Sequence, residues 1–333
     1  MKTRIIILAC LVSLLFVANI FFGSVHIDLA DTLRIITGSD DVSAPLRYIV
    51  INSRLPQAVT ALLAGAGLAV SGLMLQTSFH NPLAGPSILG ITSGANLGVA
   101  LVMLAFGGTV SAGLYTLNGN LAIVGAAFAG SLLIMSILMA LSALLKNNLM
   151  LLITGIMMGY ITSAVISLLN FVASEDSIHG FIIWGMGSFG GVSLEQLPFF
   201  SSLCGVGLLL SLLLVKPLNA ILLGENYAVN LGLNIQRTRH LLLLATGLLT
   251  AVITAYCGPV SFIGLAVPHI AFLVMGTSNH RASMPATMLT GAAVALFCNL
   301  VCTMPASTVI PLSAVTPIIG APVILYIICK RGK

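Results

Sequence analysis

Residues 57–77 read QAVTALLAGAGLAVSGLMLQT, a continuous run without a charged side chain. A helix needs about 20 apolar residues to cross the hydrocarbon core of a bilayer, so this stretch has the length and composition of a membrane span. Small residues recur in it four positions apart, at Ala61, Gly65 and Ala69. Such a face lets a second helix approach closely, which is how helices pack in membranes. The stretch therefore predicts a tightly packed transmembrane helix.

The composition extends this interpretation from one segment to the whole chain. Of 333 residues, 58% are hydrophobic and only 6% are charged, and the mean hydropathy is +1.13. A soluble domain carries about 25% charged residues. At about 20 residues per span, the chain holds at most about a dozen spans joined by short loops. No room is left for a soluble catalytic domain.

Apolar runs bounded by polar residues, glycine or proline predict ten spans. They cover about 5–23, 57–77, 89–106, 121–145, 149–172, 197–215, 241–257, 260–275, 285–303 and 312–329. We interpret the first run as a retained span rather than a cleaved signal peptide, because it continues to Phe22 and is too long for the apolar part of such a peptide. The expected fold is therefore an all-α polytopic membrane protein, with ten transmembrane helices in one domain over residues 1–333.

The distribution of basic residues predicts the orientation. With the N-terminus in the cytoplasm, ten lysines and arginines lie inside and three lie outside, as the positive-inside rule requires. The inner set is Lys2, Arg4, Lys146, Lys216, Arg237, Arg239, Arg281, Lys330, Arg331 and Lys333, and the outer set is Arg34, Arg47 and Arg54. Both termini are then cytoplasmic, at the inner membrane. The net charge of +5 reflects topology and contact with lipid, and does not indicate a nucleic-acid partner.

Two segments outside the spans have apolar clusters that are too short to cross a bilayer. Residues 28–37 place Leu29, Leu33 and Ile36 on one helical face, which predicts a short helix on the outer membrane surface. The segment between the fifth and sixth spans is rich in glycine but contains apolar residues around Trp184, which predicts a re-entrant or interfacial helix.

The predicted spans contain no charged residue that could couple transport to a proton gradient. All Asp, Glu, Lys and Arg residues lie outside them, whereas proton-driven transporters usually need an intramembrane carboxylate. The chain also lacks a Gly-Lys-Ser/Thr phosphate loop. If the protein pumps, its energy comes from a separate subunit. Sodium coupling through backbone carbonyls is an alternative that these absences leave open.

The sequence offers little support for catalysis or for a cofactor. His269 is the histidine within a span, and an intramembrane enzyme that pairs it with Ser261 is a weak alternative because no acidic residue in a span could orient the imidazole. The six cysteines form no CxxC pair, which favours buried thiols over a metal site. We expect no catalytic residue, no metal and no cofactor.

The longest inner loop, residues 216–240, contains an apolar stripe. Ala228, Leu231 and Ile235 recur in it at helical spacing. An exposed apolar stripe needs a partner. The residues alone leave two alternatives open, which are packing against the protein's own spans and docking of another subunit.

Five motifs, taken in order, resemble the FecCD-type permeases of bacterial importers for iron-siderophores, haem and cobalamin. They are RLP at 54–56, HNPLAGPSILG at 80–90, GENYAVNLGLNI at 224–235, GPVSFIGLAVPHIA at 258–271 and GAP at 320–322. The resemblance implies a type II ABC importer in which two permease copies pair around a pathway. Two ATPase subunits then dock inside and hydrolyse ATP, and a substrate-binding protein delivers the substrate outside. An iron-siderophore complex is the expected substrate, with cobalamin or haem as the alternative.

The resemblance also implies roles for particular residues. A cytoplasmic gate would contain Asn81 and Leu83 from one loop and Asn148 from another. The ATPase would contact a coupling helix that contains Glu225, Ala228, Leu231, Gly232 and Ile235. On the outer side, Arg54 would form a salt bridge with the binding protein.

The chain departs from the family pattern in three places. Gln57 and Phe272 stand where family members often have arginine, and VIPLSAVTP at 309–317 replaces a familiar Glu-Leu-Pro-Gly-like element. A missing outer arginine weakens an electrostatic clamp on the binding protein. The departures therefore affect the expected docking and substrate more than the expected fold.

Overall fold

The computed structural model describes the chain except for residues 39–41, 108, 113–114, 146–147, 305–308 and 332–333. Two of the basic residues with a predicted position, Lys146 and Lys333, lie outside the described residues. The helices are α1 (Lys2–Phe21), α2 (Leu29–Ile36), α3 (Ala44–Tyr48), α4 (Leu55–Ser78), α5 (Ile91–Ala100), α6 (Asn120–Leu144), α7 (Asn148–Val172), α8 (Glu175–Gly185), α9 (Leu197–Leu213), α10 (Val215–Leu222), α11 (Glu225–Asn230), α12 (Ile235–Cys257), α13 (Ile263–Met275), α14 (His280–Thr303) and α15 (Leu312–Arg331).

All ten predicted spans coincide with helices, namely α1, α4, α5, α6, α7, α9, α12, α13, α14 and α15. Within the described residues, six helices are long and apolar enough to cross a membrane on their own, and α9 with α10 gives a seventh span that is bent by 47°. The other three predicted spans correspond to shorter apolar helices, which contain α5, α13 and α15. The all-α polytopic fold is confirmed.

Two helices begin earlier than the apolar pattern predicts, because polar caps start them outside the apolar run. The Asn234 side chain accepts the N–H of Arg237, so α12 begins at Ile235 rather than near 241. The Asn279 side chain accepts the N–H of Arg281, so α14 begins at His280 rather than near 285. A short hairpin of β1 (Thr109–Ala112) and β2 (Tyr115–Asn118), which the sequence analysis does not predict, connects α5 to α6.

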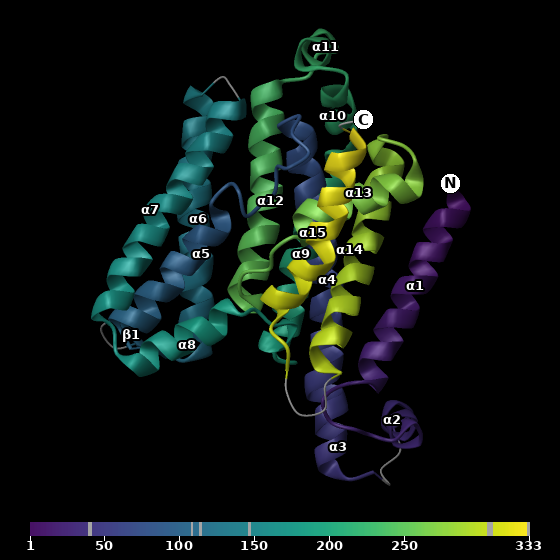
Figure 1. The fold of residues 1–333 in the computed structure, drawn as a ribbon, viewed down its shortest axis with the longest axis vertical. Coiled ribbons are helices and arrows are strands. Elements are labelled where there is room, and N and C mark those ends of the chain that lie inside the picture. Colours follow the sequence, from purple (N-terminus) through teal and green to yellow (C-terminus); the bar gives the residue numbers. More distant parts are fainter. Residues whose placement is uncertain (39–41, 108, 113–114, 146–147, 305–308, 332–333) are drawn as a thin grey trace.

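The two ends of the bundle carry different elements. The start of α1 and the end of α15 lie toward the end where α11 projects beyond its neighbours, and α2 and α3 lie at the opposite end (Figure 1). The predicted surface helix is α2, and its apolar residues Leu29, Leu33 and Ile36 are exposed. The predicted interfacial helix is α8, where Trp184 stacks on Phe181.

Helix α4 lies at the centre of the bundle and touches α13 and α14 backbone to backbone. A Cβ added at Gly65 would lie 2.2 Å from the Gly291 carbonyl oxygen, and one added at Gly72 would lie 1.6 Å from the Gly264 carbonyl oxygen. No real side chain fits at such distances. The small-residue face predicted for residues 57–77 is therefore the surface on which α14 packs.

Gly65→Val is expected to destabilise the folded protein by about 3 kcal/mol or more, because added bulk in a close contact costs typically 1–3 kcal/mol and here meets rigid backbone. Thermal unfolding in detergent can be followed with a dye that reacts with thiols, since Cys204, Cys257, Cys298 and Cys302 are buried. Gly125→Val is the control, because a Cβ there meets no atom within 4 Å. Equal melting temperatures for the two variants would contradict this packing.

Candidate functional site

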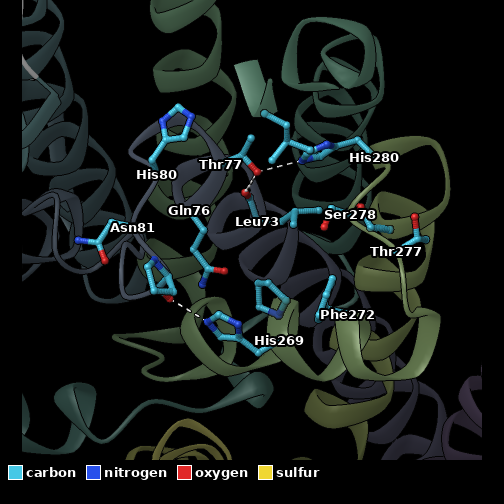
Figure 2. A pocket seen from close by; sticks show the side chains of 14 residues that line it. Leu73, Gln76, Thr77, His80, Asn81, His269, Phe272, Thr277, Ser278 and His280 are labelled. Atoms are coloured by element: carbon cyan, nitrogen blue, oxygen red, sulfur yellow. Dashed lines mark hydrogen bonds between the residues drawn. The ribbon is translucent and has the colours of Figure 1, made fainter. Parts of the chain in front are cut away.

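A polar pocket of about 250 Å³ lies where the end of α4 meets α10, α13 and the start of α14 (Figure 2). Its polar lining comes from Gln76, Thr77, His80, Asn81, His269, Thr277, Ser278, His280 and Ser283. Phe272, one of the departures from the family pattern, also lines the pocket. No group of three or more His, Cys, Asp or Glu residues in the described chain is placed to hold a metal ion.

The predicted gate residues Asn81 and Leu83 lie in the loop that follows α4, and Asn81 lines this pocket. The Asn81 side chain accepts the N–H of Leu83 at 2.9 Å, which forms a tight local turn. Leu83 itself is 42% exposed. His80 has a left-handed backbone conformation with φ of 48°, so the chain turns sharply as it leaves the helix.

His269 holds this loop against α13. Its Nε2 lies 2.8 Å from the carbonyl oxygen of Pro82 (Figure 2). A carbonyl only accepts hydrogen bonds, so Nε2 carries the proton and donates. On the same side, the Gln76 amide donates to the carbonyl of Leu265 at 3.0 Å. His269 is therefore a hydrogen-bonded residue that positions the loop, as expected for a satisfied core histidine.

A second buried histidine, His280, joins three elements. Asn219 Oδ1 accepts the backbone N–H of His280 at 2.8 Å and lies 3.0 Å from its Nδ1, so Nδ1 carries the ring proton. His280 Nε2 lies 2.9 Å from the Thr77 hydroxyl, which also donates to the carbonyl of Leu73 at 2.9 Å (Figure 2). His80 Nε2 also donates to the carbonyl of Ile221 in α10 at 3.1 Å. These bonds connect α10 to the end of α4 and to the start of α14.

The third predicted gate residue, Asn148, is the first residue of α7. Its side chain lies outside the described part of the structure, as do residues 146–147. Its approach to Asn81 and Leu83 therefore stays a prediction.

The predicted coupling helix is shorter than its motif. Helix α11 ends at Asn230, and the chain then turns through Gly232, whose φ is +82°. The Leu233 N–H bonds to the Ala228 carbonyl and the Gly232 N–H to the Val229 carbonyl, a pattern that closes a helix with glycine in the left-handed position. Glycine is favoured here because the backbone has a positive φ, which residues with a side chain rarely adopt.

The apolar stripe predicted on this segment divides into two faces. Ala228 is fully buried, and Ile235 packs against the core cluster that contains Leu218 and Ile221. Leu231 is 61% exposed. The exposed apolar side chains on and around α11 are Leu223, Tyr227, Val229 and Leu231. Ala228 and Ile235 therefore follow the alternative of packing against the protein's own helices, and Ala228 offers no exposed surface to an ATPase in this structure.

Arg54 is buried, with 5% of its surface exposed, and does not extend toward the outer solvent. Its guanidinium donates to the carbonyls of Ile20 at 3.0 Å and Phe21 at 2.8 Å, and also to the carbonyl of Val25. These groups lie at and just beyond the end of α1, where backbone carbonyls have no partner within the helix. In this structure Arg54 therefore fastens α1 to α4.

Gln57, the residue after the Arg-Leu-Pro motif, is also bonded inside the bundle. Its amide donates to Asn299 Oδ1 at 3.0 Å, and the Asn299 amide donates to Asn19 Oδ1 at 2.7 Å. This chain of amides connects α4, α14 and α1. Buried amides of this kind need partners, because an unpaired polar group in an apolar medium costs several kcal/mol.

The bundle of long, apolar helices defines a polytopic membrane protein. The sequence matches the FecCD transport family over residues 11–330. The chain belongs to this family, which confirms the resemblance found in the sequence.

Individual relatives agree with this assignment. The chain is 34% identical over 299 residues to the vitamin B12 import system permease protein BtuC of Citrobacter koseri, covering 90% of this chain and 88% of that protein. It is 35% identical over 294 residues to the BtuC protein of Klebsiella pneumoniae subsp. pneumoniae, covering 88% and 86%. A solved structure described as an inward-facing conformation of a metal-chelate type ABC transporter superposes with a TM-score of 0.86 at 28% identity, covering 99% and 100%.

Arg54→Gln is expected to lower the stability of the permease by about 3 kcal/mol, because hydrogen bonds to charged groups contribute about 1.5–3 kcal/mol each. The measurement is thermal unfolding of the permease alone in detergent. Arg34→Gln is the control, since Arg34 is an exposed arginine paired with Asp31 at 3.4 Å, and such pairs contribute little. Unchanged stability, with weaker affinity for a binding protein, would instead support the docking role.

Proposed function

We propose that this chain is the permease subunit of an ATP-driven importer that moves cobalamin across the bacterial inner membrane by alternating access. The observation that supports cobalamin is the identity of about one third, over nearly the whole chain, to permeases named for vitamin B12 import. This favours the alternative in the sequence analysis over an iron-siderophore. Cobalamin is itself a cobalt chelate, so the metal-chelate neighbour is compatible with it.

The proposal includes partners that supply energy and substrate. Two copies of the permease pair around the pathway, two ATPase subunits dock inside, and a binding protein docks outside. Helix α7 supports the pairing, because it leaves many large apolar side chains exposed, among them Met157, Ile161, Leu168 and Phe171, on a face that a second copy can cover.

We further propose that the end of the bundle with α11 is cytoplasmic. The start of α1 and the end of α15 lie toward that end (Figure 1). Basic residues there include Arg4, Lys216 and Arg281. The positive-inside rule assigns such an end to the cytoplasm.

Uptake into vesicles tests the substrate. The permease is reconstituted with an ATPase and a binding protein from the same genome, and cobalamin or a ferric siderophore is offered outside. ATP-dependent accumulation of cobalamin is the expected result. Accumulation of the siderophore alone would overturn the assignment of substrate but not of class, and sodium-dependent accumulation without ATP would overturn the class.

The gate proposal rests on the loop after α4, where Leu83 is exposed and His269 fixes the preceding carbonyl. Leu83→Ala is expected to raise passive efflux of cobalamin from loaded vesicles in the absence of ATP, because a constriction excludes solute only while its side chains meet. Leu29→Ala, an exposed leucine on α2, is the matched control. Efflux equal to that of the unmodified protein would remove Leu83 from the gate.

The coupling proposal rests on the exposed apolar residues around α11. Leu231→Asp is expected to weaken ATPase binding tenfold to a hundredfold, about 1.4–2.8 kcal/mol, because it places a charge in an apolar contact. Copurification of the ATPase in detergent measures this. Leu231 is preferable to Gly232 or Ala228, where substitution would disturb the end of α11 or the core. Leu29→Asp serves as control, and normal copurification of Leu231→Asp would show that α11 is not the docking element.

A further inference from the structure

Arg239 makes the contact that the proposed mechanism leaves unexplained. It lies in the second turn of α12 and is buried. Its Nη2 lies 3.6 Å from Glu225 Oε1 of α11, and its Nη1 donates to the carbonyl of Leu145 at 3.4 Å. Leu145 follows the last residue of α6. One side chain therefore touches both the element proposed to receive the ATPase and the end of a membrane span that is distant in sequence.

We infer that Arg239 is a positioning residue that transmits movement of α11 to the inner end of α6. This inference rests on the proposed function, because it assumes that the ATPase moves α11. It adds a residue to the coupling pathway that neither the motifs nor the family resemblance indicated.

The burial of Arg239 is the physical reason that movement is transmitted. The side chain of Arg239 is 8% exposed, whereas that of Glu225 is 38% exposed. A buried guanidinium that loses a partner leaves an uncompensated charge, which is strongly destabilising. If α11 shifts, Arg239 therefore follows Glu225, and the Leu145 carbonyl follows Arg239 or loses its donor.

The end of α6 is a suitable place to receive this movement. The last carbonyls of a helix have no partner within the helix and carry partial negative charge. A positive, planar side chain with several N–H donors can satisfy such a carbonyl and a carboxylate at once, which a lysine ammonium does less well. A cavity of about 180 Å³, lined by Leu145, Glu225, Val229 and Arg239 among others, gives the contact room to rearrange.

The other side of the coupling segment has a separate connection. Helix α10 bonds to the end of α4 through His80 and Ile221, and to α14 through Asn219 and His280. Those bonds lead to the loop that contains Asn81 and Leu83. Within the described residues, Arg239 forms a polar link from α11 to the end of α6. Loss of Arg239 should therefore affect coupling without removing the contact between α10 and α4.

The experiment compares Arg239→Met with Arg237→Met, an exposed arginine on the same helix. In the reconstituted importer, ATPase copurification should be unchanged in both variants. For Arg239→Met alone, cobalamin transported per ATP hydrolysed should fall about 5- to 10-fold, at the low end of what coupling between sites produces. Glu225→Gln removes the ion pair but keeps the bond from Arg239 to the Leu145 carbonyl, so it should lower the cobalamin transported per ATP by a smaller factor. This second variant tests the inference if Arg239→Met does not fold.

A measurement on the permease alone separates this inference from the proposed function. Spin labels at Leu144 and Leu231, both exposed, report the distance between the end of α6 and the turn after α11. The distance distribution should broaden in Arg239→Met and stay narrow in Arg237→Met. If the distance distribution broadens in Arg239→Met but the permease binds no ATPase, the link from α11 to α6 is supported and the proposed function is contradicted. Wild-type coupling and an unchanged distribution in Arg239→Met and Glu225→Gln would overturn the inference.

Discussion

Contact between backbones, without side chains in between, is the constraint on which the rest of this structure depends. Helix α4 meets α14 at Gly65 and Gly291, and meets α13 at Gly72 and Gly264. Apolar side chains gain little from leaving lipid for a protein interior, so membrane helices associate through close packing and polar bonds. These glycine contacts fix α13 and α14 around α4, and thereby place His269 and His280 beside the loop that leaves α4. The polar pocket exists because the helices beneath it cannot separate.

Arginine side chains perform a common task at the ends of several helices. Arg54 donates to carbonyls at the end of α1, and Arg4 donates to the carbonyls of Val274 at 2.8 Å and Met275 at 3.1 Å, at the end of α13. Arg239 does the same for Leu145, after α6. Each satisfies groups that a helix leaves unpaired and that lipid cannot hydrogen-bond. The arginines that predict the topology therefore also connect helices by hydrogen bonds. A count of charges on each side of the membrane does not show this second role.

The spans were predictable because bilayer thickness acts on each segment independently, and a run such as 57–77 carries that signal locally. The burial of Arg54 was not predictable from the sequence. Its partners are backbone carbonyls of residues about thirty positions earlier, and a backbone carbonyl gives no sequence signal because every residue has one. Ile235 does not continue the helical stripe of Ala228 and Leu231, because the chain turns at Gly232 and Ile235 begins the next helix. Glycine is the commonest residue just past a helix end, so Gly232 is the sequence signal that marks the end of α11. The contact of Arg239 with Leu145 joins distant segments and has no local signal.

The attachment of α1 has a consequence for biogenesis. Asn19 near its end donates to the Leu296 carbonyl and accepts from Asn299, both in α14. Synthesis proceeds at about 5–20 residues per second, so α1 precedes α14 by a time on the order of tens of seconds. During that interval the Asn19 amide has no partner in α14, but it can donate to Leu15 within its own helix, a bond that persists in the finished protein at 2.8 Å. The first helix can therefore reside in lipid until the span that completes its packing is made.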